Sequence, residues 1–493
     1  MKKIILGLTL LIAILLVVLL INTFSLKSRQ VSVTNPYSSP LVDPDATTRL
    51  AGAIRFKTVS DQKPEQENSQ QFLAFREYLR QVFPKTHATL NEEVIGGHSQ
   101  LFTWKGRDDS LKPILFAAHL DVVPVESSSE KDWAYPPFDG QVSDGFVWGR
   151  GTIDDKSGVL ALLEAVEFLL NENFQPSRTV YLAFGHDEEV GGKHGAAAIA
   201  AVLASRSVQF EYVLDEGSLI VDGLIPGISK PIALIGIAEK GFLSLQLQVN
   251  SNPGHSAVPP EHTAIGVLSQ AINRLEENQM PGHLSGVMRE TFEYLGPEMP
   301  WSKKLIFANL WLFRPLLERE LSTTPATNAS LRTTLAVTMI EGGVKENVLP
   351  AKASAVINLR ILPGDTMEGV TAYVHQIVND ERVKISRFGD DANEPSAISE
   401  IESKSFTDLQ QTIRQVFPEV LVAPALVLGA TDSRHYQPLT RNVFRFQPYI
   451  FTESDLLRIH GVNERIQVEG YKRSITFYCQ LIKTSANVAT ANR

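Results

Sequence analysis

Three apolar segments of the chain end in side chains that can bind metal ions or transfer protons. Residues 114–118, 179–184 and 212–214 run into His119-Leu120-Asp121, His186-Asp187-Glu188-Glu189 and Asp215-Glu216, respectively. We expect these segments to be strands of a parallel sheet, because their carboxyl ends would then share the edge where open α/β folds bind ligands. The sequence therefore predicts a polar site at that edge.

Two further segments add a carboxylate and an imidazole to this set. The glycine-rich loop 149–156 supplies Asp154 just before a predicted helix, and residues 459–464 supply His460 after an apolar stretch. Imidazoles and carboxylates without a cysteine cluster suit zinc, and there are more acids than one ion needs. Each motif alone is weak evidence, but the five in one chain predict a site for two metal ions.

The elements that must position these residues follow an α/β pattern. From residue 47 to about residue 237, apolar strands alternate with amphipathic helices, of which 158–170 is the clearest. This alternation predicts a mostly parallel sheet that is covered by helices on both faces.

The pattern changes after Glu239-Lys240-Gly241. Apolar and polar residues alternate from Leu243 to Val249, which is typical of a half-exposed antiparallel strand. The following segments complete a β-α-β-β-α-β order, the ferredoxin-like module, which we expect to form an inserted lid and dimerisation domain. The predicted boundaries are 1–26 for a membrane anchor or signal segment, 27–46 for a tether, 47–239 and 391–493 for the two parts of the catalytic domain, and 240–390 for the lid with an aromatic insert near 290–329.

The N-terminal segment is suited to a membrane. Residues 4–21 form an uncharged apolar run whose helical length approaches the thickness of a bilayer core. Lys2 and Lys3 precede the run, and no Ala-x-Ala cleavage site follows it. These features favour a retained anchor over a cleaved signal peptide, with the catalytic domain exported to the periplasmic, extracellular or lumenal side. Both alternatives stay open here.

Charge and cysteine content narrow the function classes. The net charge is -9, and no Lys/Arg block interleaved with aromatic residues occurs beyond the extreme N-terminus, so nucleic acid is not an expected partner. The single cysteine, Cys479, cannot form an internal disulfide and lies in the pattern of a C-terminal helix, which predicts a buried thiol. The composition favours a small-molecule substrate.

Four longer motifs carry a resemblance to a known family. They are Ala-His-Leu-Asp-Val-Val-Pro-Val at 118–125, Gly-His-Asp-Glu-Glu-Val-Gly-Gly at 185–192, Asn-Val-Leu-Pro at 347–350 and Gly-Ala-Thr-Asp-Ser-Arg at 429–434. Over essentially the whole exported chain, the sequence resembles the zinc metallopeptidase family of aminoacylase, glutamate carboxypeptidase and carboxypeptidase S. Within that family it looks most similar to carboxypeptidase S and to the secreted N-fatty-acyl-amino-acid synthase/hydrolase.

The resemblance implies roles for the residues of the predicted metal site. Two Zn²⁺ per subunit are implied, with Co²⁺ or Mn²⁺ as possible substitutes. One ion would be bound by His119, Asp154 and Asp215, and the other by Asp154, Glu189 and His460. Glu188 would be the general base, and Asp121 would accept the free N–H of His119 and fix its tautomer.

The resemblance also implies residues that contact the substrate. His255 would reach into the site of a partner subunit as an oxyanion donor, which implies a homodimer. Asn347, Arg360 and Gly429 match positions that grip the substrate's carboxylate, a task for which a planar guanidinium is suited. Ala430 departs from the pattern, since many relatives have Gly or Asn there, and it leaves the shape of that end of the pocket open.

These features together predict a binuclear zinc-dependent hydrolase that cleaves the amide bond of N-acyl amino acids or the C-terminal peptide bond of small peptides. A reversible N-fatty-acyl-amino-acid synthase/hydrolase is the first alternative, because one site must catalyse both directions. An aminopeptidase is a second alternative, against which the lid residues Asn347 and Arg360 count. A non-catalytic exported binding protein is a third, against which the retained Glu188 and metal ligands count.

The aromatic insert near 290–329 permits three interpretations. Its Trp301, Phe307, Trp311 and Phe313 supply more apolar area than a small lid needs. They could close the lid's own core, line a channel for a lipidic acyl group, or rest on the membrane surface. The sequence leaves this choice open.

Overall fold

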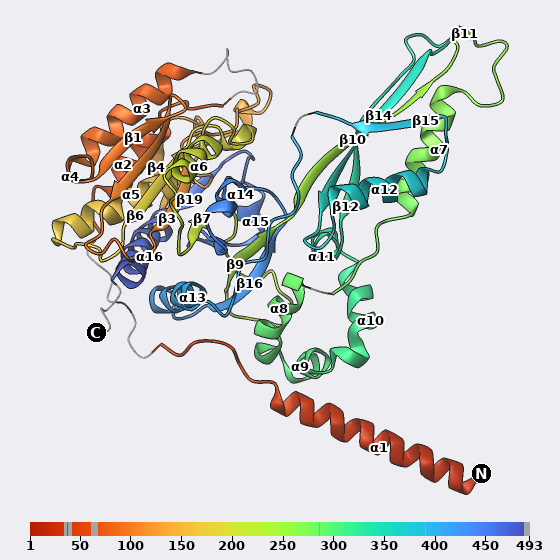
Figure 1. Ribbon diagram of the computed structural model, residues 1–493, viewed down its shortest axis with the longest axis horizontal. Coiled ribbons are helices and arrows are strands. Elements are labelled where there is room, and N and C mark those ends of the chain that lie inside the picture. The colour runs from red at the N-terminus through yellow and green to blue at the C-terminus, as the bar shows by residue number, and fades with distance from the viewer. Residues whose placement is uncertain (34–36, 38–41, 61–67, 285, 390, 488–493) are drawn as a thin grey trace.

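The structure is a computed structural model that describes residues 1–493 except 34–36, 38–41, 61–67, 285, 390 and 488–493. Seven residues of the predicted tether, 34–36 and 38–41, therefore lie outside the described residues. Figure 1 shows a large α/β body, a smaller sheet beside it, and the helix α1 (Lys2–Ser25) projecting from the body with the N-terminus at its far end.

The body is built on a ten-stranded sheet. Four neighbouring strands at its centre run parallel, namely β6 (Val180–Gly185), β3 (Ile114–His119), β7 (Val213–Asp215) and β17 (Val443–Arg445). Antiparallel pairs flank this centre, with β1 (Asn91–Ile95) and β2 (Ser99–Trp104) on one side and β9 (Ile232–Glu239) and β8 (Ile220–Val221) on the other. The strands β16 (Leu421–Val427) and β18 (Ile450–Phe451) add parallel pairs to β9 and β8.

Helices cover both faces of this sheet, as the α/β pattern predicted. Along β3, Phe116 packs into the larger core, whereas Leu115 and Ala117 pack into a smaller one, because successive strand side chains point to opposite faces. The larger core is formed with α2 (Ala46–Ile54), α3 (Ser69–Val82), α5 (Lys156–Asn171), α13 (Lys404–Val416) and α16 (Val468–Ala486). The smaller core is formed with α6 (Ala196–Ser205) and α14 (Ser433–Tyr436). Cys479 is buried in α16, as predicted.

A second, four-stranded antiparallel sheet follows directly from the first, since only Lys240 separates β9 from β10 (Gly241–Asn250). The order of its strands is β12 (Thr334–Gly342), β14 (Lys352–Ile361), β10 and β15 (Val383–Arg387). Buried apolar residues of β10 pack against α7 (Ala264–Glu277) and α12 (Met367–Val378), which gives the β-α-β-β-α-β order. A small pair, β11 (Gly254–His255) and β13 (Val348–Leu349), forms the tip of this part (Figure 1).

The residues of the aromatic insert form four helices, α8 (Gly286–Leu295), α9 (Trp301–Ala308), α10 (Leu310–Leu321) and α11 (Pro325–Leu331). Val287, Leu295 and Met299 are buried in the core of the large sheet and not in that of the small one. Phe307 stacks on Phe292 with ring centroids 4.8 Å apart and also packs against that core. The insert is therefore attached to the α/β body.

Candidate metal centre

Three of the predicted metal ligands lie together at the carboxyl edge of the large sheet. His119 ends β3, Glu189 lies in a 3-10 turn (Glu188–Val190) after β6, and Asp154 lies in the loop that precedes α5. Each offers one ligand atom, and the three atoms lie within 4.8 Å of one another. His119 Nε2 and Asp154 Oδ1 are 2.8 Å apart, so a carboxylate and an imidazole already face each other.

His460 and Asp215 reach the same region from other elements. His460 Nε2 is 3.1 Å from Asp154 Oδ2 and 3.2 Å from Glu189 Oε2, so Asp154 lies between two imidazoles. Asp215 ends β7, which pairs with β3, and its side chain is buried. Burial raises the pKa of Asp215 to about 6. The structure thus brings all five predicted ligands to one edge.

Asp121 holds two parts of this cluster in place. Its Oδ1 lies 3.3 Å from His119 Nδ1, on the side of the ring that faces away from Asp154. Its carboxylate also accepts the backbone N–H groups of Glu188 (3.2 Å) and Glu189 (3.1 Å) and the hydroxyl of Ser60 (2.7 Å). One buried carboxylate therefore orients the histidine and the turn that carries both glutamates.

Glu464 is a residue that the sequence analysis did not assign. Its carboxylate accepts the backbone N–H groups of Gly151 (3.0 Å), Ile153 (2.8 Å) and Asp154 (3.3 Å) and pairs with Arg150 at 2.6 Å. It thereby fixes the loop of Asp154 to the segment of His460. Its partners lie more than 300 residues earlier in the chain, and only its nearness to His460 in the sequence could have indicated it.

The electrostatics of the cluster favour bound cations. Burial raises the pKa of Glu188 well above its usual range, and the neighbouring carboxylates of Asp432 and Glu189 raise it further. Among the described residues, Glu189 Oε1 and Asp215 Oδ2 are buried carboxylate oxygens that accept no hydrogen bond. A buried, unpartnered carboxylate is costly unless a cation pairs with it. Together with two imidazoles, this donor set fits divalent metal ions with nitrogen and oxygen ligands.

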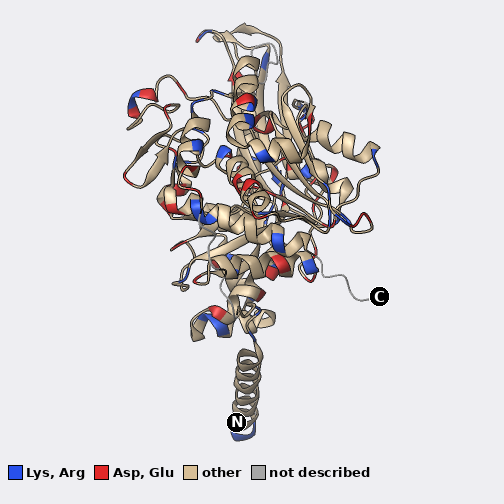
Figure 2. Cartoon of the chain, turned by 90° about the vertical axis from the view of Figure 1, so that its left-hand side faces the viewer, with Lys and Arg blue, Asp and Glu red and all other residues tan. Residues whose placement is uncertain are grey.

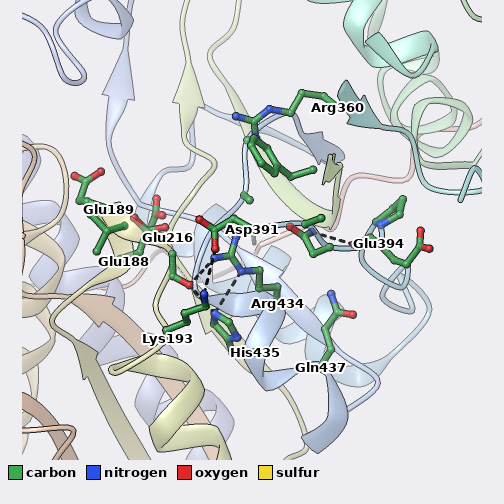
Figure 3. Close-up of a pocket in the computed structure, with 18 of the residues that line it drawn as sticks. Glu188, Glu189, Lys193, Glu216, Arg360, Asp391, Glu394, Arg434, His435 and Gln437 are labelled. Carbon is green, nitrogen blue, oxygen red and sulfur yellow. Dashed lines mark hydrogen bonds and ion pairs between the residues drawn. The ribbon is translucent and has the colours of Figure 1, made fainter. Parts of the chain in front are cut away.

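A cavity of about 730 Å³ opens beside the cluster. Figure 3 shows Glu188, Glu189 and Glu216 on one side of it and Arg360 and Arg434 on the other. Arg434 was quoted in the 429–434 motif but given no role, although its guanidinium donates to the carbonyl of Gly191 at 2.7 Å at the cavity wall.

The predicted substrate-binding residues divide into two groups. Arg360 and Gly429 line the cavity, whereas His255 and Asn347 do not. Both are exposed at the tip formed by β11 and β13, where the Ser256 N–H donates to the Asn347 carbonyl at 3.2 Å. Figure 1 shows β11, which carries His255, far from β3 and β7 of the same chain. None of the described residues of the insert, 290–329, lines the cavity.

Comparisons with known proteins agree with this geometry. Residues 115–484 match the model of peptidase family M20/M25/M40. The chain is 44% identical to a probable carboxypeptidase S-like protein of Dictyostelium discoideum over 97% of this chain and 93% of that one. It is 41% identical to an N-fatty-acyl-amino acid synthase/hydrolase of Xenopus tropicalis over 96% of this chain and 93% of that one.

A solved structure extends the likeness to the fold. The chain superposes on an M20 family metallo-carboxypeptidase of Sulfolobus solfataricus with a TM-score of 0.64, at 19% identity, over 90% of this chain and 99% of that one. The match confirms the mixed α/β fold, and the family match supports an enzyme over a non-catalytic binding protein. The chain therefore belongs to peptidase family M20/M25/M40 and is a metal-dependent peptidase or amidohydrolase.

Proposed function

We propose that this enzyme is a binuclear zinc-dependent hydrolase that cleaves an amide bond next to a free carboxylate, in an N-acyl amino acid or at the C-terminus of a small peptide. The observation that carries the substrate class is the pair of guanidinium groups across the cavity from the acids. Burial, and then the nearby charge of Arg434, lowers the pKa of Arg360. No described carboxylate pairs with either arginine: Arg360 lies over the Phe242 ring and Arg434 donates to the Gly191 carbonyl, so a substrate carboxylate would give both guanidinium groups a charged partner.

The residues at the sheet edge would have separate roles in such a reaction. His119, Asp154, Asp215, Glu189 and His460 would hold two metal ions. When bound, the ions would supply positive charge that polarises the scissile carbonyl and acidifies a water. Asp121 keeps His119 and the glutamate turn in position through the contacts described above.

Glu188 is the proposed proton carrier. Its side chain lines the cavity next to Glu189, on the wall opposite the arginines (Figure 3). Its carboxylate accepts a proton from the attacking water and delivers it to the leaving nitrogen, so that the amine departs neutral. Arg360 and Arg434 meanwhile hold the carboxylate of the substrate and set which bond lies near the base.

The test compares matched substrates. An N-acetyl amino acid should be hydrolysed and its C-terminal carboxamide should be a much poorer substrate, because the amide cannot form charged bonds to the arginines. Chelation should abolish turnover of both, and Zn²⁺, Co²⁺ or Mn²⁺ should restore it. Equal kcat/KM for acid and amide would exclude the carboxylate grip, and full activity without metal would exclude the metal mechanism.

A reversible N-fatty-acyl-amino-acid synthase/hydrolase is the second candidate, favoured by the 41% identity to the Xenopus enzyme of that name. One site must catalyse both directions, so acyl preference distinguishes this candidate better than direction does. The measurement is kcat/KM for one amino acid carrying acetyl, octanoyl or palmitoyl groups. A rise with chain length supports a lipid substrate, whereas a preference for acetyl excludes it.

The exposed tip supports a homodimer. His255 and Asn347 cannot contact a substrate in the cavity of their own chain from where they lie, and we propose that they enter the cavity of a second copy. The edge strand β12, on which Met339 and Ile340 are 49% and 62% exposed, offers a surface for that copy.

The N-terminal helix supports a retained anchor. Among the described residues, α1 is the one helix long and apolar enough to cross a membrane, with a mean hydropathy of 3.4. The buried Asn309 side chain donates to the Leu19 carbonyl at 3.1 Å, and it would lose that acceptor if α1 were cleaved. We propose that α1 stays attached and that the catalytic part is exported.

A further inference from the structure

The last turns of α1 pack on the insert. Leu19 and Thr23 are buried although the rest of α1 is largely exposed, and they lie against α9. Figure 2 shows the remainder of α1 standing clear of the body, with charged residues only at its far end. The helix therefore leaves the body through a packed joint at its carboxyl end.

A polar contact locks this joint. Asn309, between α9 and α10, is completely buried and donates to the Leu19 carbonyl (3.1 Å), while Asn22 Nδ2 donates to Asn309 Oδ1 (2.9 Å). Separating the helices would remove the Leu19 and Asn22 partners of this amide and leave it the Leu305 carbonyl at 2.9 Å. The angle between α1 and the insert is thus held by specific bonds.

The residues that follow α1 are bound to the body as well. Arg29 pairs with Glu290 and Glu293 of α8 at 3.3 and 3.4 Å, and its guanidinium lies 4.6 Å from the centre of the Tyr294 ring. The Gln30 side chain exchanges two hydrogen bonds of 2.8 Å with the backbone of Val422. The direction of α1 relative to the insert is therefore fixed on both sides of its end.

The same insert exposes large apolar side chains. Trp301, Trp311 and Leu316 are 54%, 61% and 59% exposed on α9 and α10. The other three tryptophans of the chain, Trp104, Trp133 and Trp148, are buried. Neither exposed tryptophan lines the substrate cavity, so the acyl channel that the sequence allowed has no support here.

We propose that α9 and α10 form a membrane seat, an interfacial element whose Trp301, Trp311 and Leu316 insert into the surface of the bilayer that α1 spans. The inference rests on the proposed anchor. The bilayer is the occupant because α9 packs against the carboxyl end of α1, where the helix leaves the apolar layer. Tryptophan is enriched at that depth, where its ring meets both lipid and water.

The test measures tryptophan quenching in the full-length protein reconstituted in phosphatidylcholine nanodiscs. Lipids brominated near the head of the acyl chain should lower the emission, and lipids brominated near its end should lower it less. The double variant Trp301→Phe/Trp311→Phe should lose most of this effect. As a matched control, Val344→Trp in the double variant restores an exposed tryptophan near the distant tip formed by β11 and β13, and this tryptophan should not be quenched.

The outcomes distinguish the proposed membrane seat of α9 and α10 from the proposed membrane anchor α1. Co-elution of the chain with nanodiscs tests α1 independently of the tryptophans. A chain that incorporates but shows equal quenching with and without Trp301 and Trp311 overturns the seat and leaves the anchor standing. A chain that does not incorporate overturns both. An Asn309→Ala variant should incorporate normally but show weaker quenching, because it loosens the joint.

Discussion

The acid cluster at the edge of the large sheet and the strand pair β11 and β13 at the tip of the small sheet both carry residues to which the family resemblance assigns roles, yet the two regions differ in the structure. The residues of the cluster contact one another within one chain, and all of them except His460 are buried or half-buried. His255 and Asn347 of the tip are exposed and face no cavity of their own chain. The contrast indicates that one chain supplies all the proposed metal ligands. The proposed oxyanion contact of His255, by comparison, needs a second chain.

The largest expected effect lies in the cluster. Glu188→Gln should lower kcat by about 10² to 10⁴-fold, since it removes proton transfer while keeping the shape of the side chain. Metal content by elemental analysis should stay unchanged. Glu394→Gln, which alters another acid that lines the same cavity, is the matched control and should stay close to native. Near-native turnover of the Glu188 variant would remove it from the mechanism.

The next effect tests whether the tip acts across subunits. His255→Ala and Glu188→Gln should each be inactive alone, and mixed dimers should regain about a quarter of the native sites by random assortment. Arg360→Ala mixed with Glu188→Gln should show no such recovery, because Arg360 lines the cavity of its own chain. If verified mixed dimers of His255→Ala and Glu188→Gln stay inactive, the proposal that His255 acts in the cavity of the partner subunit is wrong.

A smaller effect is expected at Arg360, which lies on β14 of the small sheet but faces the cavity. Arg360→Lys keeps the charge and loses the planar fork, so KM should rise about tenfold or more while kcat changes little. Arg434→Lys should act in the same direction. An unchanged KM for acid substrates in both variants would exclude the arginines from the carboxylate grip.

The smallest effect is a pH dependence of the metal-free chain. Hydrogen bonds to Asp154 and Glu189 raise the pKa of His460 from its ordinary 6.5 to about 10. The folded state therefore keeps a proton that the unfolded state releases, so this stabilisation is full below pH 6.5 and is lost as pH rises to about 10. The effect is modest because the His460 side chain is 50% exposed.

Urea unfolding of chelated protein across that range measures the effect. His460→Gln should flatten the dependence, since glutamine does not titrate. The native chain should lose free energy of unfolding relative to the variant between pH 6.5 and 10. If the difference between the two stays level or grows in favour of the native chain, the contacts of His460 are contradicted.

Sequence patterns predicted the part of the site that depends on neighbouring strands. β3, β6 and β7 are adjacent and parallel, so strand periodicity alone could bring His119, Glu189 and Asp215 to one edge. His460 joins Asp154 across 306 residues, and no local pattern encodes that contact. Only the family resemblance indicated it.

The relation between the two sheets could not be predicted either. Local periodicity correctly predicted the six elements of the β-α-β-β-α-β order within 240–390, but not the small pair β11 and β13. The distance of His255 from the cavity depends on how one sheet is set against the other. Asn22 and Asn309, which form the joint, are 287 residues apart in the sequence, and no local motif marks either of them. Such contacts follow from packing and not from propensity.

The place of β17 has a consequence for biosynthesis. This strand, Val443–Arg445, lies between β7 and β9 at the middle of the large sheet, although both neighbours precede it by some two hundred residues. At ribosomal speed the edges of β7 and β9 therefore wait on the order of ten seconds or longer before their partner emerges. A nascent chain exposes these unpaired strand edges during that interval, so its dependence on chaperones should be strongest late in synthesis.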